Sequence, residues 1–225
     1  MGIRPGAGKK DWMCVMKKVI GITGGVGSGK SVILSVLKKK YRAQVIEADM
    51  VAKELMMPGM PGYEGIREEW GDRFFAEDGS IDKEKLGTFL YYYPEFRLRL
   101  NAIIHPLVRD EVEARIKRSR RSVIAYESAL PEAARMQELC GEIWFIHVPE
   151  KERIRRLMAG RGYPESKCAS IIAAQPQEYE YVRLADHVID NSGTVAESEA
   201  QIRVIMEPDS TEPAVGKAMR MRRMR

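Results

Sequence analysis

The segment from Gly24 to Ser31 constrains this chain more than any other, because it reads glycine, four residues, glycine, lysine and serine. A short β-branched apolar run, 19–23, precedes it, and apolar residues at helical spacing follow it in 30–40. This context predicts a loop between a buried strand and a helix, where glycines let the backbone approach an anion and the helix N-terminus supplies positive potential. The predicted phosphate-binding residues are Gly24, Gly25, Val26, Gly27, Ser28, Gly29, Lys30, Ser31 and Val32.

Three residues of this loop have distinct predicted roles toward a nucleotide. Lys30 would reach the β- and γ-phosphates of ATP, and the Ser31 hydroxyl would ligate Mg²⁺. The backbone N–H of Val32 would close around the α-phosphate. The structural alternative is a chance glycine-rich turn, against which the preceding strand and the following helix argue. We therefore expect ATP and Mg²⁺ as ligands.

Four further apolar runs are predicted strands. They lie at 44–47, 122–126, 142–147 and 187–190, and helical segments separate them. Strands that alternate with helices are typical of a parallel sheet covered on both faces. The sequence therefore predicts an α/β fold of three layers with a five-stranded parallel sheet.

Two stretches depart from this alternation. Residues 56–118 have helical patterning and no convincing strand, which predicts an inserted helical subdomain. Residues 151–175 contain an Arg-rich helix, a Gly-Tyr-Pro break at 162–164 and a second helix. Because Gly and Pro interrupt helices, the second stretch predicts a mobile lid.

The two ends of the chain are expected to lie outside a domain at 17–206. Residues 1–16 form a predicted flexible leader, and residues 207–225 form a predicted disordered basic tail. Three widely spaced cysteines fit a reducing compartment, so a cytoplasmic location is expected. No apolar run is long enough to span a membrane, and no signal peptide is predicted.

The net charge of +5 suggests nucleic-acid binding only until its position is considered. Residues 217–225 carry +5 and residues 1–18 carry +4, so residues 19–216 carry −4 of the total of +5. The charge therefore gives little support for a basic binding face, and no nucleic-acid partner is expected.

Asp49 ends the segment that follows the second predicted strand. In a doubly wound sheet this position lies at the carboxyl edge, close to the phosphate loop. A carboxylate there can orient an acceptor hydroxyl, accept its proton, or hold Mg²⁺ through water. The alternative is that Asp49 only caps a helix at 50–55.

Several ordered segments together resemble the dephospho-coenzyme A kinases, over about residues 16–206. The opening from Met16 to Ser31 is similar to theirs, as is the aspartate motif at 46–49. The similarity continues through the segments 78–82, 100–109, 153–163, Gln175 and 185–193. The phosphate loop alone is shared by many unrelated enzymes, but this ordered set is specific.

The resemblance implies a P-loop kinase fold and transfer of the ATP γ-phosphoryl group to the 3′-hydroxyl of the dephospho-coenzyme A ribose. It implies that Asp49 is the general base, that 56–118 binds the acceptor and that 151–175 is the lid. It also makes His105 and Arg109 candidate acceptor-site residues. Their alternative is a His-Pro turn at a helix N-terminus followed by a solvated arginine.

Lid arginines and one strand-end acid complete the predicted site. Arg156 and Arg161 could close on the phosphates and offset charge in the transition state, with Arg161 favoured because it flanks Gly162. The alternative is a solvated helix face that includes Arg153, Arg155 and Arg156.

The chain also departs from the family pattern. Val32 stands where the family has a threonine or similar residue, and Glu47 replaces an aspartate. Glu127 occupies the end of the third strand in place of the usual aspartate, and we expect it to support Mg²⁺.

Two other functions remain open at this level. One is another small-molecule or nucleotide kinase of the same fold, which would not need the long helical insertion. The other is a nucleotide-dependent switch that binds nucleic acid through the basic tail.

Overall fold

The structure is a computed structural model that describes residues 17–131 and 134–208. The predicted leader 1–16 and the tail from residue 209 onward lie outside the described residues. Among the described helices, none has the length and apolar composition needed to cross a membrane.

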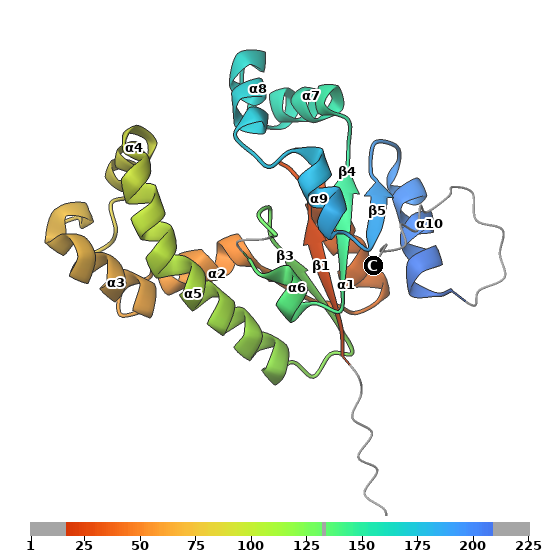
Figure 1. The fold of residues 1–225 in the computed structure, drawn as a ribbon, viewed down its shortest axis with the longest axis horizontal. Helices are drawn as coiled ribbons and strands as arrows, with labels where there is room; N and C mark the ends of the chain where they lie inside the picture. The colour runs from red at the N-terminus through yellow and green to blue at the C-terminus, as the bar shows by residue number, and fades with distance from the viewer. Residues whose placement is uncertain (1–16, 132–133, 209–225) are drawn as a thin grey trace, which may run out of the picture.

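A parallel sheet forms the centre of the fold (Figure 1). Its strands are β1 (Lys18–Thr23), β2 (Gln44–Glu47), β3 (Val123–Glu127), β4 (Glu142–His147) and β5 (His187–Asp190). Their order across the sheet is β2-β3-β1-β4-β5, and every neighbouring pair is parallel. The prediction of a five-stranded parallel sheet is confirmed. Because β1 lies at the centre, its carboxyl end brings the phosphate loop between the ends of β3 and β4.

Helices cover both faces of this sheet. On one face lie α1 (Lys30–Lys40) and α10 (Val195–Met206), and on the other lie α2 (Ala48–Leu55), α5 (Pro94–Arg118) and α6 (Met136–Leu139), with α3 (Pro61–Trp70) packed against α2 and α5 farther out. Successive strand side chains alternate between the two cores, as a period of two requires. On β1, Ile20 packs with α1 and α10 whereas its neighbour Val19 packs in the core on the other face, and on β3 Ala125 and Ile124 divide in the same way. The fold therefore has three layers.

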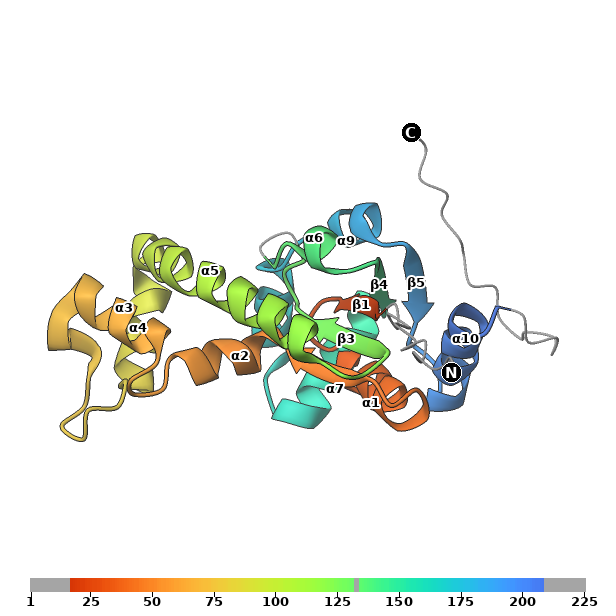
Figure 2. The same ribbon diagram turned by 90° about the horizontal axis from the view of Figure 1, so that it is seen from below.

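The chain between β2 and β3 consists of helices joined by turns, with a single antiparallel bridge between Phe75 and Ile81. Besides α2, α3 and α5 it contains the 3₁₀ helix η1 (Gly71–Phe74) and α4 (Lys83–Tyr92). Figures 1 and 2 show α3 and α4 standing away from the sheet, while α5 runs back across it. The long helix α5 thus joins the outlying helices to the core.

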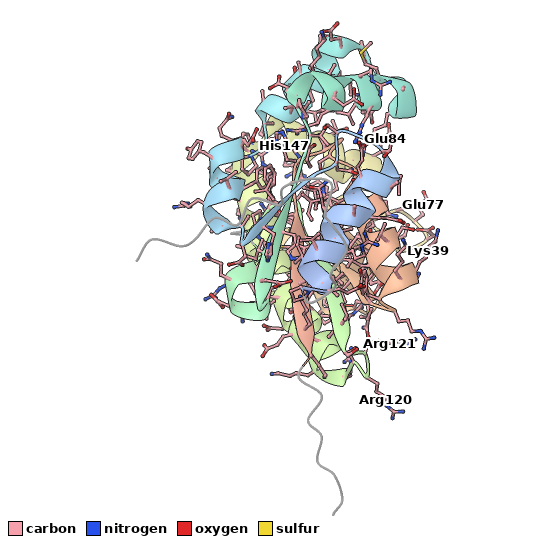
Figure 3. All side chains as sticks on the ribbon, turned by 90° about the vertical axis from the view of Figure 1, so that its right-hand side faces the viewer. Lys39, Glu77, Glu84, Arg120, Arg121 and His147 are labelled. Atoms are coloured by element: carbon pink, nitrogen blue, oxygen red, sulfur yellow. The ribbon has the colours of Figure 1, made fainter. Side chains whose placement is uncertain are left out.

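A second group of helices follows β4. These are α7 (Glu150–Arg161), α8 (Glu165–Ala173) and α9 (Glu178–Leu184), and α7 ends at Gly162, whose φ of 65° is accessible to glycine at little cost. In Figure 1, α7 and α8 lie at the end of the sheet where the strands terminate. Arg120 and Arg121, between α5 and β3, point outward at the opposite end (Figure 3). Ligands of parallel α/β sheets bind at the carboxyl ends of the strands, so the candidate site is expected at the α7 end of the sheet.

Candidate active site

The phosphate loop connects the buried strand β1 to helix α1, as its sequence predicts. Gly24, Gly27 and Gly29 have φ values of 148°, 81° and 79°, a region that residues with a Cβ rarely adopt. Space is limiting as well, because a Cβ on Gly24 would lie 2.7 Å from the Ile146 carbonyl oxygen on β4. The loop can therefore take this shape only with glycine at these positions.

Lys30 links the loop to the end of β3. Its Nζ atom donates to the Gly24 carbonyl oxygen at 2.9 Å and lies 3.4 Å from Oε1 of Glu127. Burial raises the pKa of Glu127, Lys30 opposes that rise, and the nearby charges of Asp49 and Glu47 add to it. Lys30 is therefore the one cation that this acidic cluster contacts directly within the described part of the chain.

The other polar groups of the loop differ in how accessible they are to a ligand. Ser31 is exposed at the start of α1, so its hydroxyl is open to a ligand. The Val32 N–H already donates to the Gly29 carbonyl oxygen at 2.9 Å, and an α-phosphate would have to share this bond. The hydroxyls of Thr23 and Ser28 are buried and lack a hydrogen-bond partner among the described residues.

Asp49 lies in the first turn of α2, and the N-cap of that helix is Glu47. The alternative assignment of Asp49 as a helix cap is therefore wrong, because the helix starts two residues earlier than the predicted 50–55. The Asp49 carboxylate is exposed, and its charge contributes to the raised pKa of Glu127. The first turn of a helix is a favourable place for an acidic side chain, and Asp49 is the acidic residue in the first turn of α2.

A cavity of about 300 Å³ opens beside Asp49, between α2, α5 and the segment after β3. His105 and Arg109 line it together with Asp49, so the structure brings the three predicted acceptor-site residues to one place. Most of the remaining wall is apolar, with Met56 and Leu100 among its residues. An apolar pocket with a few polar groups at one side suits an organic molecule that must be held in one orientation.

His105 and Pro106 lie inside α5, which continues from residue 94 to residue 118. The alternative of a His-Pro turn at a helix start is therefore wrong. A proline within a helix deprives the carbonyl of residue i−4 of its partner, and here that residue, Ala102, is exposed to water. Burial lowers the pKa of His105, which keeps its imidazole neutral near pH 7. Arg109 lines the cavity while its guanidinium donates to Asp110.

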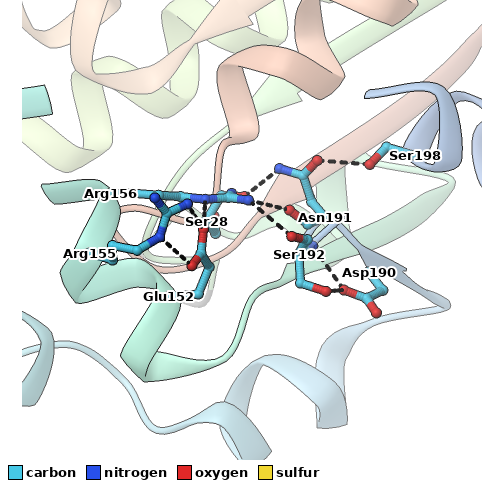
Figure 4. Close-up of polar contacts among 8 residues, drawn as sticks. All are labelled: Ser28, Glu152, Arg155, Arg156, Asp190, Asn191, Ser192 and Ser198. Atoms are coloured by element: carbon cyan, nitrogen blue, oxygen red, sulfur yellow. Dashed lines mark hydrogen bonds and ion pairs between the residues drawn. The ribbon is translucent and has the colours of Figure 1, made fainter. Parts of the chain in front are cut away.

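The two predicted lid arginines lie in different surroundings. Arg156 donates from Nη2 to the Asn191 carbonyl oxygen at 2.9 Å and from Nε to Glu152 at 3.0 Å (Figure 4). A Cβ on Gly29 would lie 3.4 Å from its Nη1 atom, so Arg156 already borders the phosphate loop. Arg161 ends α7, is exposed, and forms no hydrogen bond or ion pair with any described residue. Arg161 is free to take an anion, whereas Arg156 is held next to the loop.

Sequence reasoning missed three residues that contact the phosphate loop. Asn191 is buried and donates from Nδ2 to the Ser28 carbonyl oxygen at 2.8 Å, although its segment predicted only a turn. Arg153 donates from Nε to the Val26 carbonyl oxygen at 2.8 Å, so the alternative of a solvated helix face is wrong for this residue. Gln175 accepts from the Val26 N–H at 2.9 Å. The only sequence signal was that all three lie in segments that resemble the family.

A family model described as dephospho-CoA kinase matches residues 18–197. The dephospho-CoA kinase of Carboxydothermus hydrogenoformans is 38% identical over 192 residues, which cover 84% of this chain and 93% of that protein. The dephospho-CoA kinase of Geobacter sulfurreducens is 37% identical over 190 residues, which cover 83% of this chain and 96% of that protein.

Solved structures show the same fold. The Thermus thermophilus protein TT1252 superposes with a TM-score of 0.71 at 25% identity, covering 86% of this chain and 98% of that one. A dephospho-CoA kinase from Campylobacter jejuni superposes with a TM-score of 0.63 at 20% identity, and the match again covers 86% of this chain and 98% of that one. A shikimate kinase from Acinetobacter baumannii superposes with a TM-score of 0.51 at 15% identity, and the match covers 87% of this chain and 96% of that one. At the two lower identities the similarity extends to the fold alone.

Proposed function

The chain belongs to the dephospho-CoA kinase family, and from that premise we propose how its own residues transfer the γ-phosphoryl group of ATP to the 3′-hydroxyl of dephospho-coenzyme A. The family is one of ATP-dependent transferases. The observation that supports this assignment of residues is the position of the cavity. Tyr126 and Ser128 line it, and Glu127 between them pairs with Lys30 of the phosphate loop. An acceptor in the cavity would therefore lie next to the nucleotide phosphates.

In this proposal Asp49 is the general base. Its carboxylate lines the cavity and is exposed, so an acceptor hydroxyl can reach it without displacing protein groups. Accepting the proton as the oxygen attacks phosphorus avoids a positively charged intermediate on the acceptor. His105 and Arg109, on the other wall, would hold the acceptor, with the neutral imidazole as a hydrogen-bond partner and the guanidinium as an anion partner.

Lys30 would reach the β- and γ-phosphates once ATP is bound. Its present partners are a carbonyl oxygen and a carboxylate, which polyphosphate oxygens can replace at the same charge-assisted distance. The loop N–H groups and the N-terminus of α1 would bind the remaining phosphate oxygens. Arg161, which has no described partner, would close on the γ-phosphate, and Arg156 would support it from its place beside Gly29.

The donor set fits a magnesium ion carried in with the nucleotide. Ser31 offers an exposed hydroxyl and Glu127 a carboxylate, both hard oxygen ligands of the kind that Mg²⁺ accepts. No group of three acids, histidines or cysteines in the described residues could hold a metal alone, so most ligands would come from phosphate and water. When bound, the ion would offset negative charge on the transferring phosphoryl group.

The helices between β2 and β3 are proposed to hold the acceptor, because α2 and α5 supply most of the cavity wall. The segment from α7 to α8 is proposed to be the lid, because it contacts the phosphate loop through arginines and bends at Gly162. A cytoplasmic location stays a prediction, consistent with the two described cysteines, Cys140 and Cys168, being free.

A coupled assay of ADP release against several acceptors tests the proposal. We expect turnover with dephospho-coenzyme A and little with shikimate, gluconate or nucleoside monophosphates, and the product should be identified as coenzyme A by mass. Turnover of a nucleoside monophosphate without any of dephospho-coenzyme A would contradict the assignment. Removal of residues 207–225 should leave transfer intact, which separates this function from a nucleic-acid switch operating through the tail.

A further inference from the structure

The lid and the phosphate loop are joined by a closed ring of three hydrogen bonds. Nε of Arg153 donates to the Val26 carbonyl oxygen at 2.8 Å, and Nη2 of Arg153 donates to Oε1 of Gln175 at 2.7 Å. The same Oε1 accepts from the Val26 N–H at 2.9 Å. Both backbone hydrogen-bonding groups of Val26 are therefore bound by side chains more than 120 positions away in the sequence.

Two glycines of the phosphate loop leave the space that this contact needs. A Cβ on Gly25 would lie 2.2 Å from Nη2 of Arg153 and 2.8 Å from Oε1 of Gln175. A Cβ on Gly27 would lie 3.0 Å from the Arg153 carbonyl oxygen, where the backbone of α7 cannot yield easily. These glycines let the start of α7 pack directly on the loop, in addition to any role toward phosphate.

Carboxylates act on the charge of Arg153 only from a distance. The side chain is half-buried, and no carboxylate among the described residues lies within ion-pair distance of it. Its neighbours on α7 differ, because Arg155 and Arg156 both pair with Glu152. A partly buried charge without a directly paired counter-ion is costly for a folded protein, and a bound anion would lower that cost.

We propose that Arg153 is a positioning residue for the nucleotide, which fixes the Val26 segment of the phosphate loop through the ring it shares with Gln175. The planar guanidinium suits this position because Nε and Nη2 point in the same direction and reach two acceptors at once. A loop held in one shape before binding loses less conformational entropy when the phosphates arrive. The inference rests on the proposed function only in requiring a nucleotide as ligand.

Calorimetric titration of the full-length protein with ATP, without acceptor, tests the inference. We expect Arg153→Gln to weaken ATP binding about tenfold or more, and Arg153→Lys to restore part of that loss because it keeps the charge but not the paired donors. The matched control is Arg155→Gln, which removes the same charge from the exposed side of α7 and should bind ATP as the wild type does. Thermal unfolding confirms that each variant is folded.

A double-mutant cycle tests whether Arg153 and Gln175 act together as one ring or as two independent contacts. Gln175→Met should also weaken ATP binding, and the double variant with Arg153→Gln should bind little worse than either single variant, because one ring is broken in each case. Steady-state kinetics should show a raised KM for ATP with the KM for the acceptor unchanged. Equal effects of Arg153→Gln and Arg155→Gln, or losses that multiply in the double variant, would overturn the inference.

The two proposals fail in different ways. If the wild type binds ATP but does not phosphorylate dephospho-coenzyme A, the proposed function is wrong, while the effect of Arg153→Gln on ATP binding still decides this inference. If transfer occurs and Arg153→Gln binds ATP within about twofold of the wild type, the inference is wrong and the function stands. Such a change in affinity is smaller than the loss of one hydrogen bond usually causes.

Discussion

Lys30 and Glu127 form a largely buried ion pair, with Nζ of the lysine 3.4 Å from Oε1 of the carboxylate. The pair joins the phosphate loop, at the end of β1, to the neighbouring strand β3. Because burial raises the pKa of Glu127 and Lys30 opposes the rise, the lysine helps to keep the carboxylate ionised. The residue expected to contact phosphate thus also stabilises a buried acid.

Replacing Lys30 with methionine should therefore affect catalysis and stability separately. We expect kcat to fall by about 10²–10³, the usual cost of removing a charge-stabilising donor from a transition state. Single-turnover kinetics with saturating ATP measure this loss. Wild-type turnover in Lys30→Met would contradict the assigned role of the lysine.

The stability of Lys30→Met should depend on pH more steeply than that of the wild type. Without the lysine the pKa of Glu127 rises further above its unfolded value, so the folded state binds this proton more tightly than the unfolded state. That contribution is present below about pH 4.5 and is lost as the pH rises through the folded pKa. Urea midpoints at pH 4.5 and 7 measure it, and the double variant with Glu127→Gln should remove the extra pH dependence.

Asp49→Asn should reduce kcat by about 10²–10⁴ while leaving the KM for ATP nearly unchanged, because only the base is removed. The substitution preserves shape, so the cavity should still take the acceptor. Glu47→Gln is the matched control, since Glu47 is an exposed acid two residues earlier that does not line the cavity. A similar loss of kcat in both variants would point to the general negative charge of this edge instead of a base at Asp49.

His105→Gln should flatten the dependence of stability on pH below about 6.5. Burial lowers the folded-state pKa of His105, so the unfolded chain binds the proton more readily and stability is lost as the pH falls from 6.5 toward the lowered value. Unfolding midpoints of the wild type should therefore drop more between pH 7 and pH 5.5 than those of the variant. The other two described histidines, His147 and His187, are present in both proteins and cancel in the comparison.

The sheet and the phosphate loop could be predicted from sequence because they depend on local signals. Apolar runs of four to six residues located each strand to within one residue, and the glycine spacing located the loop. Element ends were less predictable, since α2 begins at Ala48 and α5 continues through Pro106. A helix that tolerates an internal proline depends on water reaching one exposed carbonyl, which local sequence does not encode.

The contacts around the loop were not predictable, because they depend on which side of a helix meets it. Arg153 and Arg155 are two residues apart in an Arg-rich helix, yet one faces the loop and the other faces solvent. A helix turns by about 100° per residue, so such neighbours point in very different directions, and only the docked position of α7 decides which is buried. Asn191 was hidden for a similar reason, because an Asn-Ser-Gly turn signal does not reveal a buried amide.

Asn191 offers the sharpest test of how the loop is supported from behind. Its side chain bridges two buried partners, donating to the Ser28 carbonyl oxygen and accepting from the Ser198 hydroxyl, each at 2.8 Å (Figure 4). Nδ2 would lie 2.3 Å from a Cβ on Gly29, so the amide fills the space behind the loop. Both partners lose their bond if the amide is removed.

Asn191→Ala should lower the free energy of unfolding by about 2–4 kcal/mol, because the buried Ser28 carbonyl loses this donor and the Ser198 hydroxyl keeps only a long bond of 3.5 Å to the Thr194 carbonyl oxygen. Asn191→Asp has the same shape and keeps the bond from Ser198, but it places a carboxylate oxygen against the Ser28 carbonyl oxygen and should weaken ATP binding as well. Ser198→Ala removes only the bond on the far side from the loop, so it should cost about 1 kcal/mol of stability and leave ATP affinity unchanged. Chemical denaturation and ATP calorimetry on the three variants measure both quantities. If Asn191→Asp bound ATP as tightly as Ser198→Ala does, the amide would stabilise the fold without shaping the loop.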